Sequence, residues 1–527
     1  MSLKIYLLSV FQALVTLGPS SSPSLETPLG LTSAGPIVDL GYSQYQGSAN
    51  TRSNITNFLG IRYAAPPLGE LRWEAPQPPL ATSGVQQATT QPGGCYTALP
   101  GAAPNNPQIM GPTDNESEDC LFLNVHVPGG QVVPTPSGGL PVVVWVHGGG
   151  YISGAASGYD GGDLIKHSNY GVIVVVIQYR LGLFGFLAGK AVKEGGALNA
   201  GLLDQNYALQ WVQAHISNFG GDPAKVTLWG ESAGGGSVLQ QLVAHGGNTQ
   251  PPLFRAAITS SPFLPSQYNY NDEKPEMLYS KVVNGAHCNS VSDTLSCLRT
   301  ADAKTLQLLN FGINIGGFFG TFTFVPVVDG TFIVERPTVT IGKGRLNGER
   351  LLAVTNAHEG DLFVNQRMLL PLTEYIKRLF PHFGSAQAAG TAMMYQGLGS
   401  NIEQANLAMG EAMFVCPAYY LLEAYGEKSW KGKFSLPPAL HIDDVAYYFT
   451  SQGPRYNNAK FITSFATSFM SFIMNGTPGV KYNTNDIKPT WNSWQYGFNE
   501  IVFDNKPPFF FPNIYASQTD VGLFERC

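Results

Sequence analysis

The chain has 527 residues, of which 44% are hydrophobic and 13% are charged, and its formal net charge is −6. This composition excludes disorder over most of the chain, because it supplies enough apolar side chains for a sizeable core. The mild acidity and the lack of any basic run give no reason to expect nucleic-acid binding.

The first 22 residues have the pattern of a secretory signal peptide. Lys4 precedes an apolar stretch at residues 5–17, and small or helix-breaking residues follow at 18–22. The alternative interpretation is a buried N-terminal helix or strand. No other stretch has the roughly 20 apolar residues that a membrane span needs. We therefore expect a secreted, extracellular protein with a signal at about residues 1–22 and a single domain over residues 23–527.

The cysteines and the glycosylation sequons are also typical of a secreted protein. In an oxidising compartment, cysteines pair as disulfides. The sequence has no C-x-x-C motif and no Cys/His cluster with zinc spacing, so we expect neither a metal nor another cofactor. Sequons of the form N-x-[ST] are acceptors for N-glycosylation on a secreted surface. The cysteines are Cys95, Cys120, Cys288, Cys297, Cys416 and Cys527, and the sequons begin at Asn54, Asn115 and Asn475.

The first third of the chain predicts strands separated by loops. Short alternating runs at residues 36–39 and 58–63 predict early antiparallel strands. The stretch 95–120 is rich in Pro, Gly and Asn and predicts a loop. The continuous apolar runs 142–146 and 172–177 are typical of parallel strands that are buried on both faces.

The rest of the chain alternates helices with strands, which predicts βαβ units and an α/β sheet. Residues 202–213 and 456–474 have helical patterns, and residues 370–425 are mostly helical. No repeat and no clear domain break occurs, so one large domain with insertions is the economical interpretation. Later strands are expected at residues 256–260, 351–355 and 501–503.

A G-x-S-x-G motif at residues 230–234 marks a candidate nucleophile, Ser232. An apolar run from Val226 precedes it, and a helical segment at residues 237–244 follows. The order of strand, motif and helix exposes a serine hydroxyl at a strained turn. The motif alone is weak evidence, since a chain with 60 Gly is expected to contain on the order of 0.5 such matches by chance.

A serine nucleophile needs donors that stabilise the developing oxyanion. Residues 147–150 read His-Gly-Gly-Gly and come directly after the strand predicted at 142–146. Backbone N–H groups in such a glycine run can approach a carbonyl oxygen closely. The alternative is a flexible glycine turn.

The nucleophile also needs an acid and a histidine, which follow the serine in this order in folds with this motif. Among the histidines, His441 lies in a predicted loop, where a base is easily presented. Glu359 comes just past the strand predicted at 351–355, at the carboxyl edge where sites of open α/β sheets gather. The residues alone leave alternatives open: His245, His287, His358 and His382 for the base, and Asp361 and Asp329 for the acid.

Several long motifs in the correct order resemble those of one family. Residues 219–234 (FGGDPAKVTLWGESAG) resemble the signature of the type-B carboxylesterases and lipases, a group that includes cholinesterases and fungal lipases. Residues 118–125 (EDCLFLNV) resemble the second signature of this family. Residues 58–69 (FLGIRYAAPPLG), 178–182 (QYRLG) and 199–205 (NAGLLDQ) are also similar to family motifs.

The resemblance extends from about residue 36 to the C-terminus and is closest in style to fungal secreted carboxylesterases and lipases. It implies an α/β-hydrolase fold, with a large, mostly parallel central sheet flanked by helices and carrying insertions. It also implies that Ser232 is the nucleophile, Glu359 the acid and His441 the base of a catalytic triad. The residues that match the family's oxyanion donors are Gly149, Gly150 and Ala233.

Further positions match structural features of the family. Two salt bridges, Arg72 with Glu118 and Arg180 with Asp204, are expected to belong to the scaffold. The resemblance implies the disulfides Cys95–Cys120 and Cys288–Cys297. Cys416 and Cys527 resemble a third pair found in cholinesterases, and free thiols are the alternative.

The sequence departs from the family pattern at three places. The loop between Cys95 and Cys120 contains Tyr96 but no Trp, which disfavours choline esters because a cation binds best over Trp. This loop also looks short beside the flap of fungal lipases. Residues 260–262 (Ser-Ser-Pro) replace the usual Ser-Gly, which puts the backbone geometry behind the triad in question.

A separate feature is the stretch 311–324, which carries five aromatic side chains. These side chains line either an acyl pocket or ordinary core.

The function predicted from the sequence is that of a secreted carboxylic ester hydrolase that forms a covalent acyl-enzyme. Its expected substrate is a small-molecule or lipid ester. The first alternative is a lipase or sterol esterase that acts on long-chain esters. The second is a cholinesterase-like adhesion protein that keeps the fold without the chemistry.

Overall fold

The computed structural model of the protein describes residues 32–103, 115–132, 138–506 and 511–527. The predicted signal peptide lies outside these ranges. Within them, no helix combines the length and apolar character needed to span a membrane.

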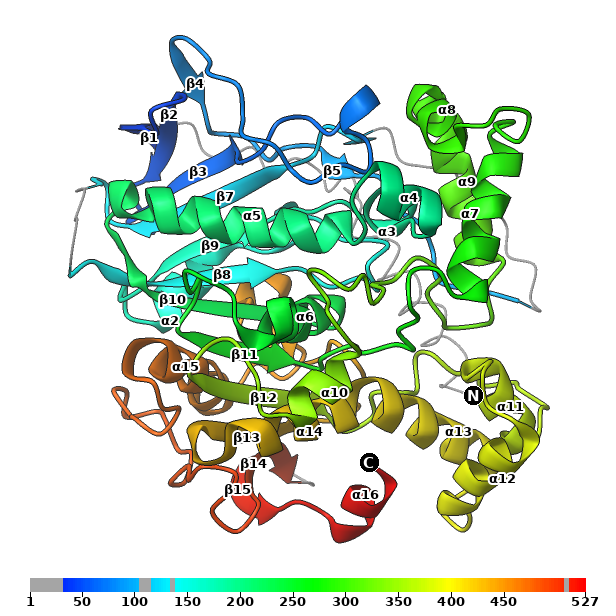
Figure 1. Ribbon diagram of the computed structural model, residues 1–527. Helices are drawn as coiled ribbons and strands as arrows, with labels where there is room; N and C mark the ends of the chain where they lie inside the picture. Colours follow the sequence, from blue (N-terminus) through cyan, green and yellow to red (C-terminus); the bar gives the residue numbers. More distant parts are fainter. Residues whose placement is uncertain (1–31, 104–114, 133–137, 507–510) are drawn as a thin grey trace.

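One 13-stranded sheet runs through the molecule (Figure 1). Six consecutive pairs in its centre, from Ile173–Ile177 across to Asn499–Lys506, are parallel. The strands outside this region pair antiparallel, except that the short strand Val85–Gln87 pairs parallel with Gln44–Asn50. The strand order is β1 (Thr32–Asp39), β2 (Gln44–Asn50), β3 (Ile55–Arg62), β7 (Phe122–Pro128), β9 (Ile173–Ile177), β8 (Leu140–Val146), β10 (Gly221–Glu231), β11 (Ala256–Ser260), β12 (Arg350–Asn356), β13 (Ser429–Phe434), β14 (Asn499–Lys506) and β15 (Phe511–Gln518), while β4 (Val85–Gln87) pairs with β2 and β5 (Gly94–Cys95) pairs separately with β6 (Glu116–Ser117).

The central strands contribute to two hydrophobic cores, one on each face of the sheet. In β8, Val144 and Val146 belong to one core, while Val143 and Trp145 belong to the other. Successive side chains of a strand point to opposite faces, so a strand covered on both sides is apolar throughout. This explains why the sequence of β8 shows a continuous apolar run and no alternation.

Helices cover both faces of the sheet (Figure 1). Helices α5, α6 and α14 pack on one face, and α2 and α15 pack on the other. The helices are α2 (Gly161–His167), α3 (Gly182–Phe186), α4 (Lys190–Gly195), α5 (Ala200–His215), α6 (Ala233–Gly247), α7 (Glu273–Gly285), α8 (Thr294–Thr300), α9 (Ala303–Ile315), α10 (Pro337–Gly342), α11 (Leu372–Leu379), α12 (Ser385–Met394), α13 (Asn401–Gly410), α14 (Cys416–Tyr425), α15 (Ala459–Asn475) and α16 (Val521–Arg526).

The predicted α/β class is confirmed, with layers of helices on a mostly parallel sheet. One boundary differs from the prediction: helix α6 begins at Ala233, whereas the sequence pattern placed its start at residue 237. The glycines at 234–236 gave no helical signal. These glycines lie in the first turn of α6, which packs closely against other segments. Only glycine fits at these positions, because a Cβ on Gly234, Gly235 or Gly236 would overlap neighbouring backbone.

Covalent and ionic links fasten the segments around the sheet. Both predicted salt bridges are present and buried, with Arg72 Nε 2.6 Å from Glu118 Oε1 and Arg180 Nη2 2.7 Å from Asp204 Oδ1. The structure contains three disulfides, and the third one pairs the two cysteines that the sequence left open. The disulfides are Cys95–Cys120, Cys288–Cys297 and Cys416–Cys527.

Candidate active site

Ser232 lies at a sharp turn between β10 and α6. Its backbone has φ 57° and ψ −122°, a region that non-glycine residues occupy only under strain. The turn is tight because Gly230 and Gly234 bring its two arms together, and a Cβ on either would overlap backbone atoms. The Ser232 N–H donates to the Ser260 carbonyl at 2.9 Å, so β11 holds the turn in place.

The structure brings Ser232, His441 and Glu359 into one hydrogen-bonded chain. His441 Nε2 lies 2.8 Å from Ser232 Oγ, and His441 Nδ1 lies 2.5 Å from Glu359 Oε2. Glu359 follows β12, and His441 is in the loop after β13, so both side chains come from the carboxyl edge of the sheet. All three residues are buried, which protects the chain of hydrogen bonds from competing water.

The competing residues from the sequence lie elsewhere. The Asp329 carboxylate accepts hydrogen bonds from the Asn199 side chain and from the Phe332 backbone N–H. His245 faces Thr249, and His382 packs against Tyr268. Asp361 lines a cavity that neither Ser232 nor His441 borders.

A second set of side chains orients the acid. Glu359 Oε1 accepts a hydrogen bond from the Ser261 hydroxyl at 2.6 Å and another from the Asn356 backbone N–H at 2.6 Å. The Asn356 side chain continues this network by donating to Ser261 Oγ and to Asp444 Oδ1. Ser261 has φ 49°, so the unusual Ser-Ser-Pro sequence gives a left-handed residue whose hydroxyl reaches the acid. Sequence reasoning missed Ser261 and Asp444 as parts of the site.

Two further buried carboxyl groups lie close to the triad. Glu231 Oε1 is 3.4 Å from His441 Nε2 and has no hydrogen-bond partner among the described residues. Burial raises the pKa of Glu231 well above its usual value, and the nearby Asp444 and Glu359 add to this rise. Burial also raises the pKa of Asp444 to about 6, although Asn356 and Tyr448 donate hydrogen bonds to it. Both carboxyl groups therefore favour the neutral form more strongly than exposed carboxyl groups do.

The glycine run after β8 folds into a tight loop beside Ser232. Gly149 and Gly150 have φ values of 102° and 63°, and the Gly149 carbonyl accepts from the backbone N–H of Ile152 and of Ser153 at 3.0 Å. In the described part of the chain, the N–H groups of Gly149, Gly150 and Ala233 donate to no protein acceptor. These three donors remain free for an oxygen of a substrate.

Aromatic rings surround the histidine and the glycine loop. The Phe414 ring centroid lies 4.3 Å from that of His441, and Phe363 lies 5.1 Å from it. Phe322 packs so closely against the loop that a Cβ on Gly150 would overlap its ring. The aromatic stretch 311–324 is therefore divided, since Phe322 lies at the site while Phe324 is buried in the core.

Among the described residues, no group of three or more His, Cys, Asp or Glu side chains is arranged to hold a metal ion. The chemistry that this arrangement supports is acyl transfer through an activated serine.

Comparisons with known proteins agree with the geometry. A family model described as the carboxylesterase family matches residues 34–506. The chain is 32% identical to Secreted lipase 1 of Botryotinia fuckeliana (strain B05.10), over 72% of this chain and 70% of that protein. It is 29% identical to Carboxylesterase patB of Penicillium expansum, over 85% and 89% of the two chains. The crystal structure of Aspergillus niger EstA superposes with a TM-score of 0.82 and 28% identity, covering 93% of this chain and 97% of that one. The chain belongs to the carboxylesterase family and is a carboxylic ester hydrolase.

Proposed function

We propose that this protein is a secreted esterase in which Ser232, His441 and Glu359 form the catalytic triad. The observation that carries the proposal is the continuous chain of hydrogen bonds, 2.8 Å from Ser232 to His441 and 2.5 Å from His441 to Glu359. Nucleophile, base and orienting acid within hydrogen-bond reach of one another are the geometric requirement for acyl transfer.

The acylation step follows from this geometry. Ser232 Oγ attacks the ester carbonyl carbon while His441 Nε2 takes the hydroxyl proton, and the carbonyl oxygen becomes an oxyanion. The N–H groups of Gly149, Gly150 and Ala233 stabilise this oxyanion. The intermediate collapses as the C–O bond to the alcohol breaks, and His441 returns the proton to the leaving oxygen.

Deacylation repeats the same steps with water. His441 removes a proton from a water molecule, which attacks the acyl carbon and releases the acid and Ser232. Glu359 orients the imidazole of His441 in both steps, and hydrogen bonds from the Ser261 hydroxyl and the Asn356 N–H hold Glu359 in place.

The aromatic rings support short acyl chains as the preferred substrates. The ring centroid of Phe263 lies 5.2 Å from that of Phe322 and 5.4 Å from that of Phe414. The three rings therefore form a continuous aromatic wall beside the glycine loop and His441. Such a wall leaves limited room beside Gly150, where an acyl group must bind if its carbonyl oxygen enters the proposed oxyanion hole.

A lipase or sterol esterase is the second candidate. It is supported by the similarity to a secreted lipase of Botryotinia fuckeliana. Rates on p-nitrophenyl esters from acetate to palmitate separate the two candidates. An esterase gives the highest kcat/KM with short chains, and a lipase gives it with long chains and with emulsified triacylglycerol.

An organophosphate tests the triad itself. We expect it to modify Ser232 stoichiometrically and to abolish activity, which peptide mass spectrometry locates. Replacing His441 by Ala should reduce kcat by at least about 10⁴-fold. Label on another serine, or a His441→Ala variant of normal activity, rejects the proposed mechanism.

Secretion is proposed from three observations. The three disulfides suit an oxidising compartment, the N-terminal sequence has the signal pattern, and relatives include a secreted lipase. Expression in a eukaryotic host tests this: the protein should be found in the medium with its N-terminus near residue 23. Retention inside the cell with an uncleaved N-terminus contradicts the proposal.

A further inference from the structure

Phe414 is the nearer of the two aromatic rings that pack against His441, the other being Phe363. Its ring centroid lies 4.3 Å from that of the imidazole, and its side chain is fully buried. The two nitrogens of the imidazole face Ser232 and Glu359. An aromatic ring in this position keeps water from the imidazole and restricts its rotation, so Phe414 bears on the geometry of the base.

The backbone that carries Phe414 is a π turn, Glu411–Val415, between α13 and α14. Such turns are rare, occur as single turns within longer helices and are frequent at functional sites. Their hydrogen bonds join residues five positions apart, so a π turn holds more residues than an α-helical turn. Because successive α-helical residues are rotated by about 100°, relaxation to α-helical geometry would rotate one flank of the turn against the other. Phe414 would then no longer face His441.

Both ends of the π turn are fastened to the same two residues, Arg526 and Cys527. At its start, the Glu411 carboxylate accepts hydrogen bonds from Arg526 Nε at 2.8 Å and Nη2 at 2.7 Å. Directly after its end, Cys416 forms a disulfide with Cys527. A bidentate ion pair fixes orientation as well as distance, so the ion pair and the disulfide together define the rotation of the turn. We call these two links the clamp.

Helix α16, which carries Arg526, is itself anchored to the sheet. The Phe524 ring centroid lies 5.5 Å from that of Tyr419 and 5.7 Å from that of Trp494. The Trp494 backbone N–H donates to the carbonyl of Ser429 at the start of β13. Since β13 leads into the loop that presents His441, the clamp ties the π turn to the strand that positions the base.

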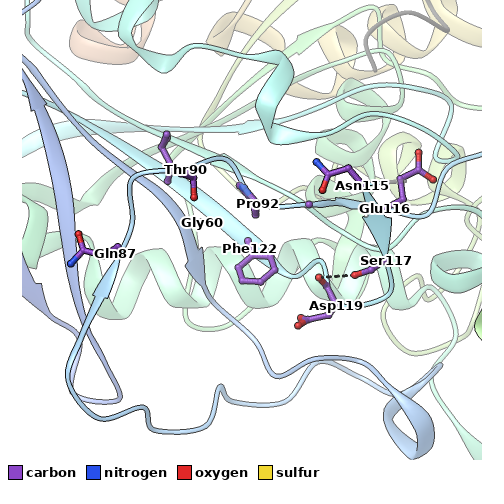
Figure 2. Close-up of a pocket in the computed structure, with 11 residues that line it drawn as sticks. Gly60, Gln87, Thr90, Pro92, Asn115, Glu116, Ser117, Asp119 and Phe122 are labelled. Atoms are coloured by element: carbon purple, nitrogen blue, oxygen red, sulfur yellow. Dashed lines mark hydrogen bonds between the residues drawn. The ribbon is translucent and has the colours of Figure 1, made fainter. Parts of the chain in front are cut away.

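The other two disulfides adjoin none of the residues that contact His441. Cys95–Cys120 lies beside a pocket of about 390 Å³ whose lining includes Asp119 and Phe122 (Figure 2). No residue of this lining belongs to the proposed triad or to the rings around His441. Cys288–Cys297 joins α8 to the segment after α7, far from α16 (Figure 1). It therefore provides a matched control for the clamp.

We propose that Phe414 is a positioning residue for His441, and that Arg526 and Cys527 hold it in place by fixing the register of the π turn. The inference rests on the proposed triad, because the effect of the clamp passes through His441. With both links intact, the imidazole keeps Nε2 toward Ser232. With either link broken, the turn relaxes toward α-helical geometry and Phe414 moves off the imidazole. A misplacement of about 1 Å costs about 100-fold in rate, so partial relaxation lowers kcat measurably.

Breaking each link tests the clamp, with p-nitrophenyl acetate as substrate well below the melting temperature of every variant. We expect Cys416→Ser/Cys527→Ser to lower kcat about 10-fold with KM unchanged. Arg526→Gln, which keeps every disulfide, should cost a similar factor, and Arg526→Lys should recover part of it by restoring the charge without the bidentate geometry. Cys288→Ser/Cys297→Ser should keep the wild-type kcat. Wild-type kcat in both clamp variants, or an equal loss in this control, overturns the proposal.

A double-mutant cycle shows whether the clamp acts through Phe414. We expect Phe414→Leu alone to lower kcat about 10-fold. Adding Arg526→Gln or Cys416→Ser/Cys527→Ser should then lower kcat by less than about 2-fold more, because the ring that the clamp positions is gone. A merely stabilising role lowers Tm in both backgrounds and leaves the effects on kcat independent. Effects that multiply in full therefore reject the proposal.

The rate of organophosphate labelling separates failure of the clamp from failure of the triad. The reagent should label Ser232 in the wild type, and about 10-fold more slowly in Cys416→Ser/Cys527→Ser, because a displaced His441 takes the serine proton less efficiently. Label on Ser232 at equal rates in the wild type and this variant rejects the clamp alone. Absence of label on Ser232 in the wild type rejects the triad and the clamp with it.

Discussion

The carboxyl of Glu231 lies beside the imidazole of His441, with Oε1 3.4 Å from the same Nε2 that faces Ser232. This carboxyl immediately precedes the nucleophile and is held in place by the turn that exposes Ser232. Burial raises the pKa of this carboxyl well above its usual value, so it becomes a carboxylate only at a higher pH than an exposed Glu does.

Replacing Glu231 by Gln therefore tests a pH-dependent role. Below the raised pKa of Glu231, Glu and Gln are both neutral, and we expect kcat/KM of the two proteins to agree within about 3-fold. Above that pKa, the Glu231 carboxylate stabilises the imidazolium of His441, so the advantage of the wild type over Glu231→Gln should grow with pH to about 10-fold. A deficit of the same size at every pH would show that the carboxyl acts through packing alone.

Asp444 should make the folded protein less stable as the pH rises. Its pKa is raised from 3.8 in the unfolded chain to about 6 in the fold. Well below pH 3.8 the group is protonated in both states and does not affect stability. Between pH 3.8 and 6 the unfolded chain loses this proton while the folded protein keeps it, so the free energy of unfolding falls. The total loss is about 3 kcal/mol, at 1.36 kcal/mol per unit of pKa shift. Urea unfolding at pH 4 and at pH 7.5 measures this change.

Asp444→Asn removes the titration. The difference in unfolding free energy between variant and wild type should move by about 2.5 kcal/mol in favour of the variant between pH 4 and pH 7.5, since a small part of the loss has already occurred at pH 4. The variant also loses one hydrogen bond, from Asn356 or Tyr448, which costs about 1 kcal/mol at both pH values. The exposed Glu374→Gln serves as a control with no such pH-dependent difference, and the prediction is wrong if Asp444→Asn behaves like it.

The sequence predicts the α/β class and much of the sheet because buried parallel strands are continuous apolar runs. The geometry also brings together Ser232, Glu359 and His441, which the family resemblance had selected among several candidates. The orienting residues had no comparable signal. Ser261 is 98 positions from Glu359, and the two meet because Ser260 of β11 pairs with Val354 of β12. Register between strands is a tertiary property that local patterns do not contain.

The same limit applies to the end of the chain. The sequence left Cys416 and Cys527 either paired or free. They meet because β15 pairs antiparallel with β14, and the following helix α16 then packs beside the start of α14. An ion pair between Arg526 and Glu411 joins the same two segments. The cavity lined by Glu359 and Asp361 also depends on this return, because β15 and α16 contribute to its lining, and no local sequence pattern predicts it.

Removing the Ser261 hydroxyl should slow catalysis without weakening substrate binding. The hydroxyl donates to Glu359 Oε1 at 2.6 Å, and a hydrogen bond to a charged group contributes about 1.5–3 kcal/mol. Ser261 has φ 49°, a left-handed conformation that strains any residue with a Cβ, so Ala removes the hydroxyl with the strain unchanged and Gly removes both. We expect kcat to fall about 10-fold in Ser261→Ala and in Ser261→Gly with KM unchanged, and Ser261→Gly to be the more stable of the two. A rise in KM with constant kcat would place Ser261 in substrate binding instead.

The Phe322 ring should limit the length of the acyl chain. It packs against Gly150, next to the N–H donors of the proposed oxyanion hole, so truncation opens space where the acyl group must bind. We expect Phe322→Ala to raise kcat/KM for p-nitrophenyl octanoate relative to acetate by about 10-fold, equivalent to about 1.4 kcal/mol of discrimination. Phe324→Ala is the control from the same segment: Phe324 is a buried core residue, so its loss should cost about 3–5 kcal/mol of stability without changing the ratio. If the folded Phe322→Ala protein keeps the wild-type ratio, the acyl group is bounded by other residues.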